Sequence, residues 1–477
     1  MLIKTVDFLN TYLWGYVLIY LLLAAGVYFT IRLGFTQISH FGHMLKLLMG
    51  SRKNKGKGIS SFQALCTTLA SRVGTGNIAG VAIAIYIGGP GAVFWMWLIA
   101  TIGMATAFAE TVLAQLYKVS DKIGGFRGGP AYYMRSGLNS NLMSILFSVF
   151  LIFTFGFAFN GVQSNSISIA MNVGFDIPKY LTGIIIAVLT AIIICGGLRQ
   201  VAKVSEFLVP IMALAYLAIT TIVLILNITE IPSMFKLIIY SAFGIKQAAG
   251  AVAGYTVSSA MMHGIKRGLF SNEAGMGSAP NAAASAVSHP THPALQGYVQ
   301  MLGPFIDTIV ICTCTALIIL LSGQSVAGSN LNGVELTQQA LAFHIGPIGK
   351  QLIAIVLLFF SFTTIIGNYA YAETNMIFLK GGNFWKLSLF RLAVIIMVFF
   401  GAISEMPVVW SIADLSMGLM ALINLIAILY LSKTVFIISR DYNQKLKAGK
   451  EAIFNINDHK ELKNKITTGL WQGQDHG

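Results

Sequence analysis

The sequence predicts an all-α polytopic membrane protein. Hydrophobic residues make up 56% of the 477-residue chain and charged residues only 10%, whereas soluble proteins carry about 25% charged residues. The mean hydropathy is +0.75. A chain this long and this apolar cannot hide its side chains in one water-soluble core, so its solvent must be a lipid bilayer.

Eleven apolar runs have the length of about 20 residues that a membrane-spanning helix needs. They cover residues 14–31, 62–88, 91–117, 141–170, 179–196, 205–227, 263–288, 295–322, 350–378, 387–404 and 407–436. The first run follows no small-residue cleavage site, so we expect a retained helix rather than a signal peptide. All four cysteines fall inside apolar segments, so we expect small hydrophobic residues and neither a disulfide framework nor a zinc cluster.

The basic residues predict the orientation of these spans. Loop 32–61 carries six Lys and Arg and no acidic residue, which places it in the cytoplasm by the positive-inside rule. Alternation then puts 118–140, 197–204, 379–386 and the tail from 433 on the same side, and these five segments hold 22 of the 31 Lys and Arg. The predicted outer segments hold four. We therefore expect the N-terminus outside and the C-terminus in the cytoplasm. The basic charge then serves topology and attraction to anionic lipid, not nucleic-acid binding.

Two of the runs are poor transmembrane helices. Residues 70–77 read Ala-Ser-Arg-Val-Gly-Thr-Gly-Asn, and residues 263–280 also place a charge, Glu273, before a pair of glycines. Glycine costs about 1 kcal/mol in a helix interior and a charge at mid-membrane at least about 2.5 kcal/mol. Irregular backbone survives at this depth only where it is buried in protein or lines a cavity. Close helix packing by small residues is the alternative explanation of the glycines, but it leaves Arg72 and Glu273 unexplained.

The two interrupted segments also match each other. Arg72-Val-Gly-Thr-Gly-Asn77 aligns with Glu273-Ala-Gly-Met-Gly-Ser278 at an offset of 201 residues, and the same offset superposes two further pairs of spans. Five spans in each half give the halves opposite orientations. Inverted five-helix repeats whose first helix is broken at mid-depth describe a LeuT-like 5+5 architecture, with one additional N-terminal helix.

This architecture divides the chain into five regions. They are an N-terminal helix with a basic loop, a first repeat, an outer connecting segment, a second repeat and a cytoplasmic tail, at residues 1–61, 62–227, 228–262, 263–436 and 437–477. We expect the tail to be solvated or to lie on the surface.

The chemistry of the first break suggests two ligands. Backbone N–H groups of Thr75, Gly76 and Asn77, at the start of a half-helix, suit a substrate carboxylate. Freed carbonyls of Ala70 and Val73, at the end of the other half, suit a sodium ion.

A hard cation needs several oxygen ligands, and hydroxyls can complete the set. Helix 350–378 offers Ser361, Thr363 and Thr364 in an otherwise apolar stretch. A hydroxyl that bonds its own helix backbone is the commoner fate of such residues, so both readings stay open at this point.

Three stretches carry a resemblance to a known family. Ser71–Gly80, Pro90–Trp97 and Arg267–Pro280 closely resemble the alanine or glycine:cation symporter family, and the match runs from about residue 60 to 430. The resemblance implies a LeuT-like fold of eleven helices and sodium-driven import of a small neutral amino acid such as alanine, glycine or glutamine. It also implies a plasma (inner) membrane location, with no obligate protein partner.

The similarity of residues 70–77 to the unwound first helix of LeuT implies the sodium ligands. These are the backbone carbonyls of Ala70, Val73 and Phe360 and the hydroxyls of Thr363 and Thr364.

The resemblance implies a substrate pose as well. The carboxylate meets Thr75, Gly76 and Asn77, and the ammonium meets carbonyls near Gly275 and Gly277, beside Ser278. Helix 141–170 offers polar side chains to the pocket, with interhelical hydrogen bonding as their other role: Asn160, Gln163 and Asn165.

One position departs from the family pattern. Asn368 stands where alanine transporters of the family tend to carry tryptophan. If it lines the pocket, the pocket is larger and more polar, which favours glutamine over alanine.

Buried charges keep other mechanisms open. Arg72 and Glu273 are expected to pair across the two breaks. Glu110 or Asp307 could carry a coupling proton, which makes a proton symporter the alternative to sodium coupling. An ion channel is more remote, since one inverted pair is not a symmetric set of filter loops. An enzyme is not expected, because we find no H-E-x-x-H or G-x-S-x-G motif.

Overall fold

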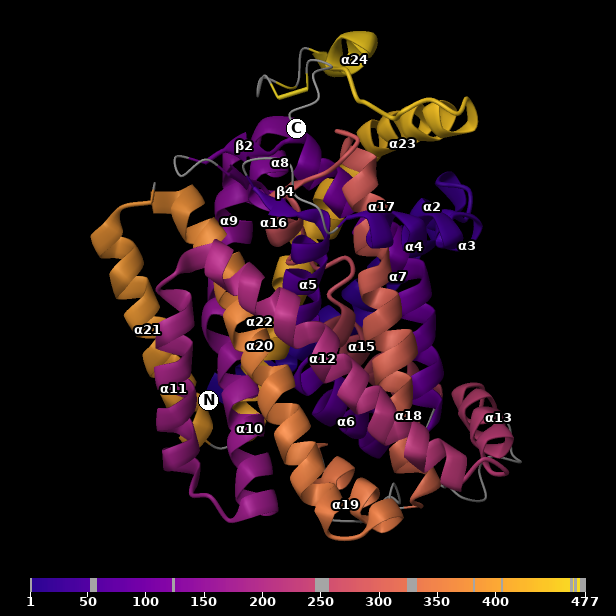
Figure 1. Cartoon of the computed structure of the whole chain (residues 1–477), viewed down its shortest axis with the longest axis vertical. Coiled ribbons are helices and arrows are strands. Elements are labelled where there is room, and N and C mark those ends of the chain that lie inside the picture. Colours follow the sequence, from indigo (N-terminus) through magenta and orange to yellow (C-terminus); the bar gives the residue numbers. More distant parts are fainter. Residues whose placement is uncertain are drawn as a thin grey trace.

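Helices make up nearly all of the computed structural model (Figure 1). The structure describes residues 2–51, 58–121, 125–244, 257–323, 333–380, 382–404, 406–463, 466 and 470–471. Four two-residue strands form one parallel and one antiparallel pair: β1 (Ile59–Ser60) with β4 (Ala286–Val287), and β2 (Val119–Ser120) with β3 (Phe126–Arg127).

The helices follow one another with short connections. The first half contains α1 (Leu2–Tyr12), η1 (Leu13–Leu18), α2 (Ile19–Arg32), α3 (Thr36–Ser39), α4 (Phe41–Gly50), α5 (Ser61–Arg72), η2 (Gly76–Gly80), α6 (Val81–Gly88), α7 (Gly91–Leu116), α8 (Pro130–Gly137), α9 (Asn141–Leu151), η3 (Ile152–Ala158), α10 (Phe159–Phe175), α11 (Lys179–Ile194), α12 (Gly197–Leu226) and α13 (Ile231–Ala242). The second half contains α15 (Val257–Asn272), α16 (Pro280–Ala283), α17 (Pro293–Pro304), η4 (Phe305–Cys312), α18 (Thr313–Leu321), α19 (Gly333–Ile345), α20 (Ile348–Lys380), α21 (Phe384–Ile403), α22 (Met406–Tyr430), α23 (Ser432–Lys447), η5 (Ile456–Asp458) and α24 (Lys460–Lys463).

The membrane spans follow from these lengths. Eight helices among the described residues are long and apolar enough to cross a membrane, and the bent pair formed by α5 and η2–α6 brings the number to nine. The apolar run at 179–196 forms the shorter helix α11, and the run at 263–288 forms two separate pieces, α15 and α16. The chain is therefore a polytopic helical membrane protein. The count of eleven spans and the inverted 5+5 repeat remain predictions.

Two groups of helices surround the interrupted segments. In the core group, α7 packs against α15 and α17, and α6 packs against α15. In the support group, α10 packs against α20 and α21, and α11 against α21 (Figure 1). The helix α5 packs against α17 of the core group and against α20 of the support group, so it joins the two groups. The first break lies where α5 meets α20, so it lies between the two groups.

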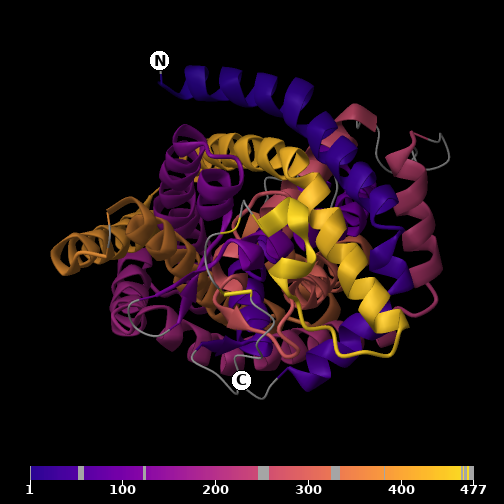
Figure 2. The same ribbon diagram turned by 90° about the horizontal axis from the view of Figure 1, so that it is seen from above.

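The N-terminal helix lies on the outside of both groups. α1 packs along α22 and α2 along α7, and Figure 2 shows this indigo helix crossing the periphery of the molecule. Its position agrees with an additional helix outside the repeat.

The predicted region boundaries fall close to helix ends, with two exceptions. The boundary at 262/263 lies inside α15, and the boundary at 436/437 lies inside α23, because the last span ends at Tyr430 and a new helix begins at Ser432. The outer connecting segment contains α13. Its residues 245–256 lie outside the described residues.

The C-terminal tail is bound to the body of the protein rather than solvated. The indole N–H of Trp471, which is 2% exposed, donates to the carbonyl of Leu116 at 3.0 Å. The Lys118 ammonium lies over the Trp471 ring at 5.2 Å. Upstream, the Phe454 N–H donates to the Thr291 carbonyl at 3.0 Å. The polar, mixed-charge sequence of the tail did not predict this attachment, because much of it depends on the side chain of one residue, Trp471.

His292 joins this tail to the start of α17. Its Nδ1 accepts the Ala294 N–H at 3.0 Å, so the neutral ring carries its proton on Nε2, which lies 3.0 Å from Asp441 Oδ2. Burial lowers the pKa of His292 to about 4 from the usual 6.5, although Asp441 acts in the opposite direction. Protonation of Nδ1 would also remove the acceptor of the Ala294 N–H.

We therefore expect acid to release the tail. The pKa of His292 is lower while the tail is bound than after its release. Above pH 6.5 the ring is neutral in both states, so it does not affect attachment. As the pH falls from 6.5 towards 4, only the released state takes up the proton, and attachment weakens. The loss is about 1.4 kcal/mol per pH unit in this window. Limited proteolysis of the tail at pH 7.5 and pH 5 measures it, with Asp441→Asn as a control whose tail is released at both values. Equal protection of the wild-type tail at both pH values would contradict this role of His292.

Candidate functional site

The first break begins where α5 ends. Ser60 and Gln63 form a capping box that starts the helix, and after Arg72 the backbone of Val73 becomes extended (φ −79°, ψ 92°). The Gly74 N–H donates to Asn77 Oδ1 at 2.8 Å. In a continuous helix this N–H would bind the carbonyl four residues earlier, so the break frees the carbonyl of Ala70.

The second break lies between α15 and α16. Glu273, Gly275 and Gly277 have positive φ values of 57°, 94° and 80°, a region that glycine adopts readily and other residues rarely. Pro280 begins α16, where its missing N–H costs nothing. Both helices are therefore interrupted where the sequence indicated.

The five predicted sodium ligands lie together. The Thr364 hydroxyl is 2.8 Å from the Ala70 carbonyl, 3.2 Å from the Val73 carbonyl and 3.0 Å from the Phe360 carbonyl. The Thr363 hydroxyl donates to the Phe360 carbonyl at 2.9 Å, which is the own-helix bond also anticipated. One hydroxyl hydrogen cannot satisfy three carbonyls. This surplus of oxygen lone pairs at one point is the donor set that a hard cation requires.

The end of the break that is predicted to bind a carboxylate is engaged by a side chain. The Thr75 N–H donates to Gln163 Oε1 at 2.9 Å, and the Thr75 hydroxyl bonds that of Ser361 at 2.8 Å. Ser361 therefore serves Thr75 and not the sodium ligand set. A substrate carboxylate at this N–H would have to displace the Gln163 amide.

Asn77 lies in a second polar cluster that the sequence did not predict as a unit. Its amide donates to Asp307 Oδ1 at 2.6 Å, while the hydroxyls of Ser271 and Thr308 donate to Asp307 Oδ2 at 2.8 and 2.7 Å. Three side-chain donors satisfy an ionised carboxylate.

The second-break residues predicted to meet the ammonium are bonded elsewhere in this conformation. The Gly275 carbonyl accepts from Asn424 at 3.0 Å and the Gly277 carbonyl from Asn281 at 3.1 Å, while the Ser278 hydroxyl donates to Glu273 at 2.6 Å.

The α15 residues that lie against the first break are Phe270 and Ser271, which a Cβ on Gly76 would contact at 3.1 Å. The sequence prediction missed these two. Their position in the last turn of a half-helix, where carbonyls lose their partners, was the available signal.

Asn160 and Asn368 lie together between α10 and α20. The Asn368 amide donates to Asn160 Oδ1 at 3.0 Å, and Asn368 Oδ1 is 2.7 Å from the Ser71 hydroxyl. Asn165 instead donates to backbone carbonyls of Gly401 and Ser404, so it serves interhelical bonding.

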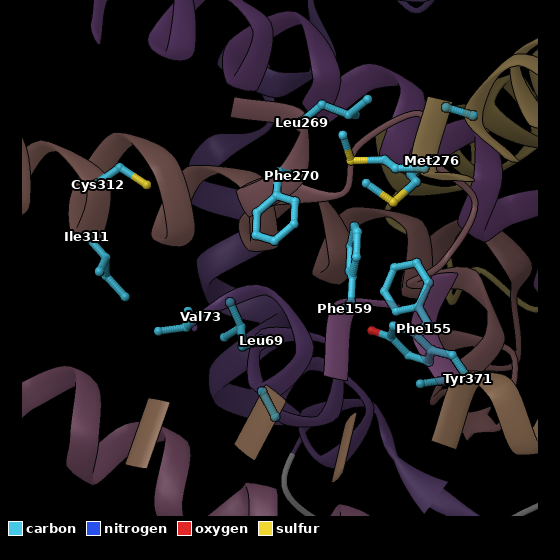
Figure 3. Packing of buried hydrophobic residues seen from close by; sticks show 14 of the residues in the cluster. Leu69, Val73, Phe155, Phe159, Leu269, Phe270, Met276, Ile311, Cys312 and Tyr371 are labelled. Atoms are coloured by element: carbon cyan, nitrogen blue, oxygen red, sulfur yellow. The ribbon is translucent and has the colours of Figure 1, made fainter. Parts of the chain in front are cut away.

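An aromatic stack covers the site on the side from which α15 enters. The ring of Phe270 lies 4.6 Å from that of Phe159 and 4.9 Å from that of Trp410. Figure 3 shows Phe159 and Phe270 side by side. Beyond these rings, both outer guanidinium nitrogens of Arg267 donate hydrogen bonds to the Asp414 carboxylate, at 3.1 and 2.9 Å. The guanidinium carbon lies 4.5 Å from the centre of the Trp410 ring. This side is closed by a buried ion pair and three rings.

A cavity of about 680 Å³ lies between α20 and α21 of the support group, the α11–α12 connection and the segments that contain β1, β2 and β3. Its lining includes Gly58, Arg127, Arg199, Glu373 and Arg391. Beside it, β1 and β4 pair the segment before α5 with the segment after α16. The two interrupted helices are thereby joined at this end.

Two expectations need correction. Arg72 does not form an ion pair with Glu273; its Nε and Nη1 have no hydrogen-bond partner among the described residues, and Glu273 binds Ser71 and Ser278 instead. None of the four cysteines forms a disulfide, and three are buried as the apolar segments predict, but Cys195 is exposed. It follows the last turn of α11 and lines the cavity, where the apolar run ends.

Comparisons with known proteins decide the family. The sequence profile described as the sodium:alanine symporter family matches residues 1–456. The chain belongs to the sodium:alanine symporter family.

Curated relatives agree with this membership. The chain is 51% identical to an uncharacterized transporter of Haemophilus influenzae, over 96% of this chain and 95% of the relative. It is 47% identical to the probable sodium/glutamine symporter GlnT of Bacillus subtilis, over 93% and 91%. It is 41% identical to the putative sodium/proton-dependent alanine carrier YrbD of the same species, over 94% of both chains.

Membership in the sodium:alanine symporter family excludes two of the classes considered from the sequence. The family consists of transporters, so the chain is not an enzyme, and symporters are not ion channels. Both interrupted helices, which carry most of the predicted site, lie within the matched residues.

Proposed function

We propose that this protein imports a small neutral amino acid together with a sodium ion by alternating access. The observation that carries the proposal is the convergence of three backbone carbonyls on the Thr364 hydroxyl, with the Thr363 hydroxyl on one of these carbonyls. Neutral oxygens from α5 and α20 would share the ion. Binding of sodium would therefore favour conformations in which the core and support groups are close together.

The substrate would bind between the same two groups. Its carboxylate would accept from the N–H groups of Thr75, Gly76 and Asn77 after Gln163 moves aside. Its ammonium would meet the last carbonyls of α15, at Phe270 and Ser271, which lie against Gly76. Gly275, Gly277 and Ser278 would join the site only in another conformation, since their polar groups are engaged here.

The side chain of the substrate would extend towards Asn160 and Asn368. This pair carries amide groups where a tryptophan ring would exclude a long substrate. A side-chain amide could replace the hydrogen bond that Asn160 and Asn368 make with each other, which favours glutamine. The name of GlnT agrees with this choice, and the family name with alanine.

Alternating access would use the two ends of the site. The Arg267–Asp414 ion pair and the aromatic stack would open towards the outside, and the cavity beside β1 and β4 would lead to the cytoplasm. This assignment takes the N-terminus as outside, as the distribution of basic residues predicts, and the inner membrane as the location, as the family resemblance implies. An ion pair is suited to close a gate. Opening separates the two charges, but water then hydrates each of them, so the free energy of opening is small.

Uptake into proteoliposomes tests the proposal. Labelled glutamine, alanine and glycine are offered under an imposed sodium gradient or an imposed proton gradient. Accumulation driven by the sodium gradient, with glutamine as the best competitor, is the expected result. No accumulation of any of the three would refute the substrate class.

Proton coupling is the second candidate. It rests on buried carboxylates near the breaks, since Asp307 and Glu110 are both 1% exposed or less. The name of the YrbD relative, which mentions sodium and proton, points in the same direction. Accumulation driven by the proton gradient alone would favour this candidate and would move the coupling away from Thr363 and Thr364.

A further inference from the structure

A chain of hydrogen bonds connects the two breaks. The Ser71 hydroxyl, in the last turn of α5, lies 2.6 Å from Glu273 Oε1 and 2.7 Å from Asn368 Oδ1. Both neighbours are oxygens. A hydroxyl has one hydrogen, so Ser71 can donate to only one of them.

A backbone carbonyl determines which group donates in each of these hydrogen bonds. The Gly156 carbonyl can only accept, so Asn160 must turn its NH₂ towards it, at 3.2 Å. The side-chain oxygen of Asn160 then faces Asn368, so Asn368 must donate to it from its own NH₂ group, at 3.0 Å. The remaining oxygen of Asn368 faces Ser71. Flipping either amide would oppose two oxygens or two NH₂ groups within hydrogen-bond distance, so Ser71 must donate to Asn368.

The contact between Ser71 and Glu273 then lacks a hydrogen. An oxygen–oxygen distance of 2.6 Å between an ionised carboxylate and a hydroxyl that points elsewhere would be repulsive. We propose that Glu273 is a proton-binding site: in this conformation its carboxyl group is protonated and donates from Oε1 to Ser71. The other oxygen, Oε2, accepts the Ser278 hydroxyl at 2.6 Å, as a protonated acid allows.

The charged neighbours agree with a neutral Glu273. The Arg72 side chain is 2% exposed and interacts electrostatically with Glu273, yet the two side chains form no ion pair. A buried guanidinium beside an ionised carboxylate should pair with it, because leaving both charges unpaired costs several kcal/mol, about 3–5. The other ionisable groups that face Glu273 are Asp307 and Tyr371. Asp307 has three donors and needs no proton, so the two carboxyl groups differ in protonation.

The proton is linked to the movement that transport requires, and this step rests on the proposed function. Ser71 belongs to the interrupted helix and Asn368 to the support group. When these separate, Ser71 loses its acceptor and can turn its hydrogen to Glu273. The carboxyl group can then release its proton to water and remain hydrogen-bonded as a carboxylate. Glu273 is thus a positioning residue that favours the present conformation when protonated and relaxes it when ionised.

Infrared difference spectroscopy of the purified protein detects this proton without any transport. A spectrum recorded between neutral and strongly alkaline pH should contain the C=O stretching band of a protonated carboxylic acid, separate from the carboxylate bands. The intensity of the band should fall in Glu273→Gln and stay at the wild-type level in the matched control Asp307→Asn, because any contribution of the buried Glu110 is common to all three proteins. An unchanged band in Glu273→Gln would overturn the proposal.

Replacement of Glu273 by similar side chains provides a second test. Glutamine offers an NH₂ to Ser71 and an oxygen to Ser278, as the protonated acid does, whereas alanine offers neither. We expect wild-type uptake to decline at alkaline pH, where Glu273 loses its proton. We expect Glu273→Gln to keep about tenfold more uptake than Glu273→Ala and to show no such decline. Equal losses in both variants, with the decline unchanged, would contradict the role of the proton. If wild-type uptake is absent while the infrared band is present, the proposed function fails and the proton site stands.

Discussion

Gly74→Ala is expected to remove most of the sodium-driven uptake. A Cβ at this position would lie 2.8 Å from Gln163 Oε1 and closer still to the Thr364 hydroxyl. Both atoms face the backbone of the break, one at the predicted anion site and the other at the predicted sodium site. Overpacking of this kind costs about 1–3 kcal/mol, and each 1.4 kcal/mol is about tenfold in binding. We expect uptake to fall by about tenfold to a hundredfold or more in proteoliposomes.

Gly80→Ala is the matched control for this substitution. Gly80 ends the same irregular turn, but a Cβ there would meet only the Thr75 carbonyl, at 3.9 Å, which is ordinary contact. We expect uptake close to wild type. Size-exclusion chromatography of both variants separates a loss of function from a loss of folding. A folded Gly74→Ala protein with wild-type uptake would place the site elsewhere.

Thr364→Val is expected to remove most of the sodium dependence. Valine keeps the shape of threonine and deletes the hydroxyl at which the carbonyls of Ala70, Val73 and Phe360 converge. An interaction with a charged partner contributes about 1.5–3 kcal/mol. We therefore expect the half-saturating sodium concentration to rise by about tenfold to a hundredfold.

Thr374→Val controls for the loss of a buried hydroxyl in the same helix. Thr374 is fully buried, and its hydroxyl bonds the Ala370 carbonyl of its own helix at 3.0 Å. It contacts no predicted ligand, so sodium dependence should stay within about twofold of wild type, since the own-helix bond contributes about 1 kcal/mol or less. If both variants shift the sodium dependence equally, Thr364 acts through helix stability and is not a ligand.

The sequence was most informative about features that are energetically costly inside a membrane. Charges and glycines at mid-membrane leave few structural solutions, so the interruptions near Gly74 and Gly275 could be located without coordinates. Two members of the predicted sodium ligand set, the carbonyls of Ala70 and Val73, could be named because a broken helix leaves its last carbonyls without helical partners. The convergence of Phe360 and Thr364 on that end came from the resemblance to a known architecture.

Side-chain hydrogen bonding at the second break could not be predicted. Asn424 reaches the Gly275 carbonyl from a distant part of the chain, and no local pattern predicts such a partner. The same holds for Ser71, which turns Glu273 away from the expected pairing with Arg72. Periodicity describes one element at a time, whereas these contacts depend on how elements pack.

The binding of sodium and of the amino acid should be thermodynamically linked. A ligand that holds the core and support groups together lowers the cost of binding the other, and by linkage each raises the affinity for the other by the same factor. Both predicted ligand sets meet at the first break, where the Gln163 amide and the Thr364 hydroxyl both face Gly74. Linkage is thus a direct consequence of the proposed geometry.

The affinity of the purified protein for glutamine and alanine, titrated calorimetrically with and without sodium, tests this account most directly. It predicts that sodium raises the affinity for the transported amino acid, with choline ineffective, and that Thr364→Val abolishes the increase while Thr374→Val retains it. Amino-acid binding that is equally tight in sodium and in choline would contradict sodium coupling at this site.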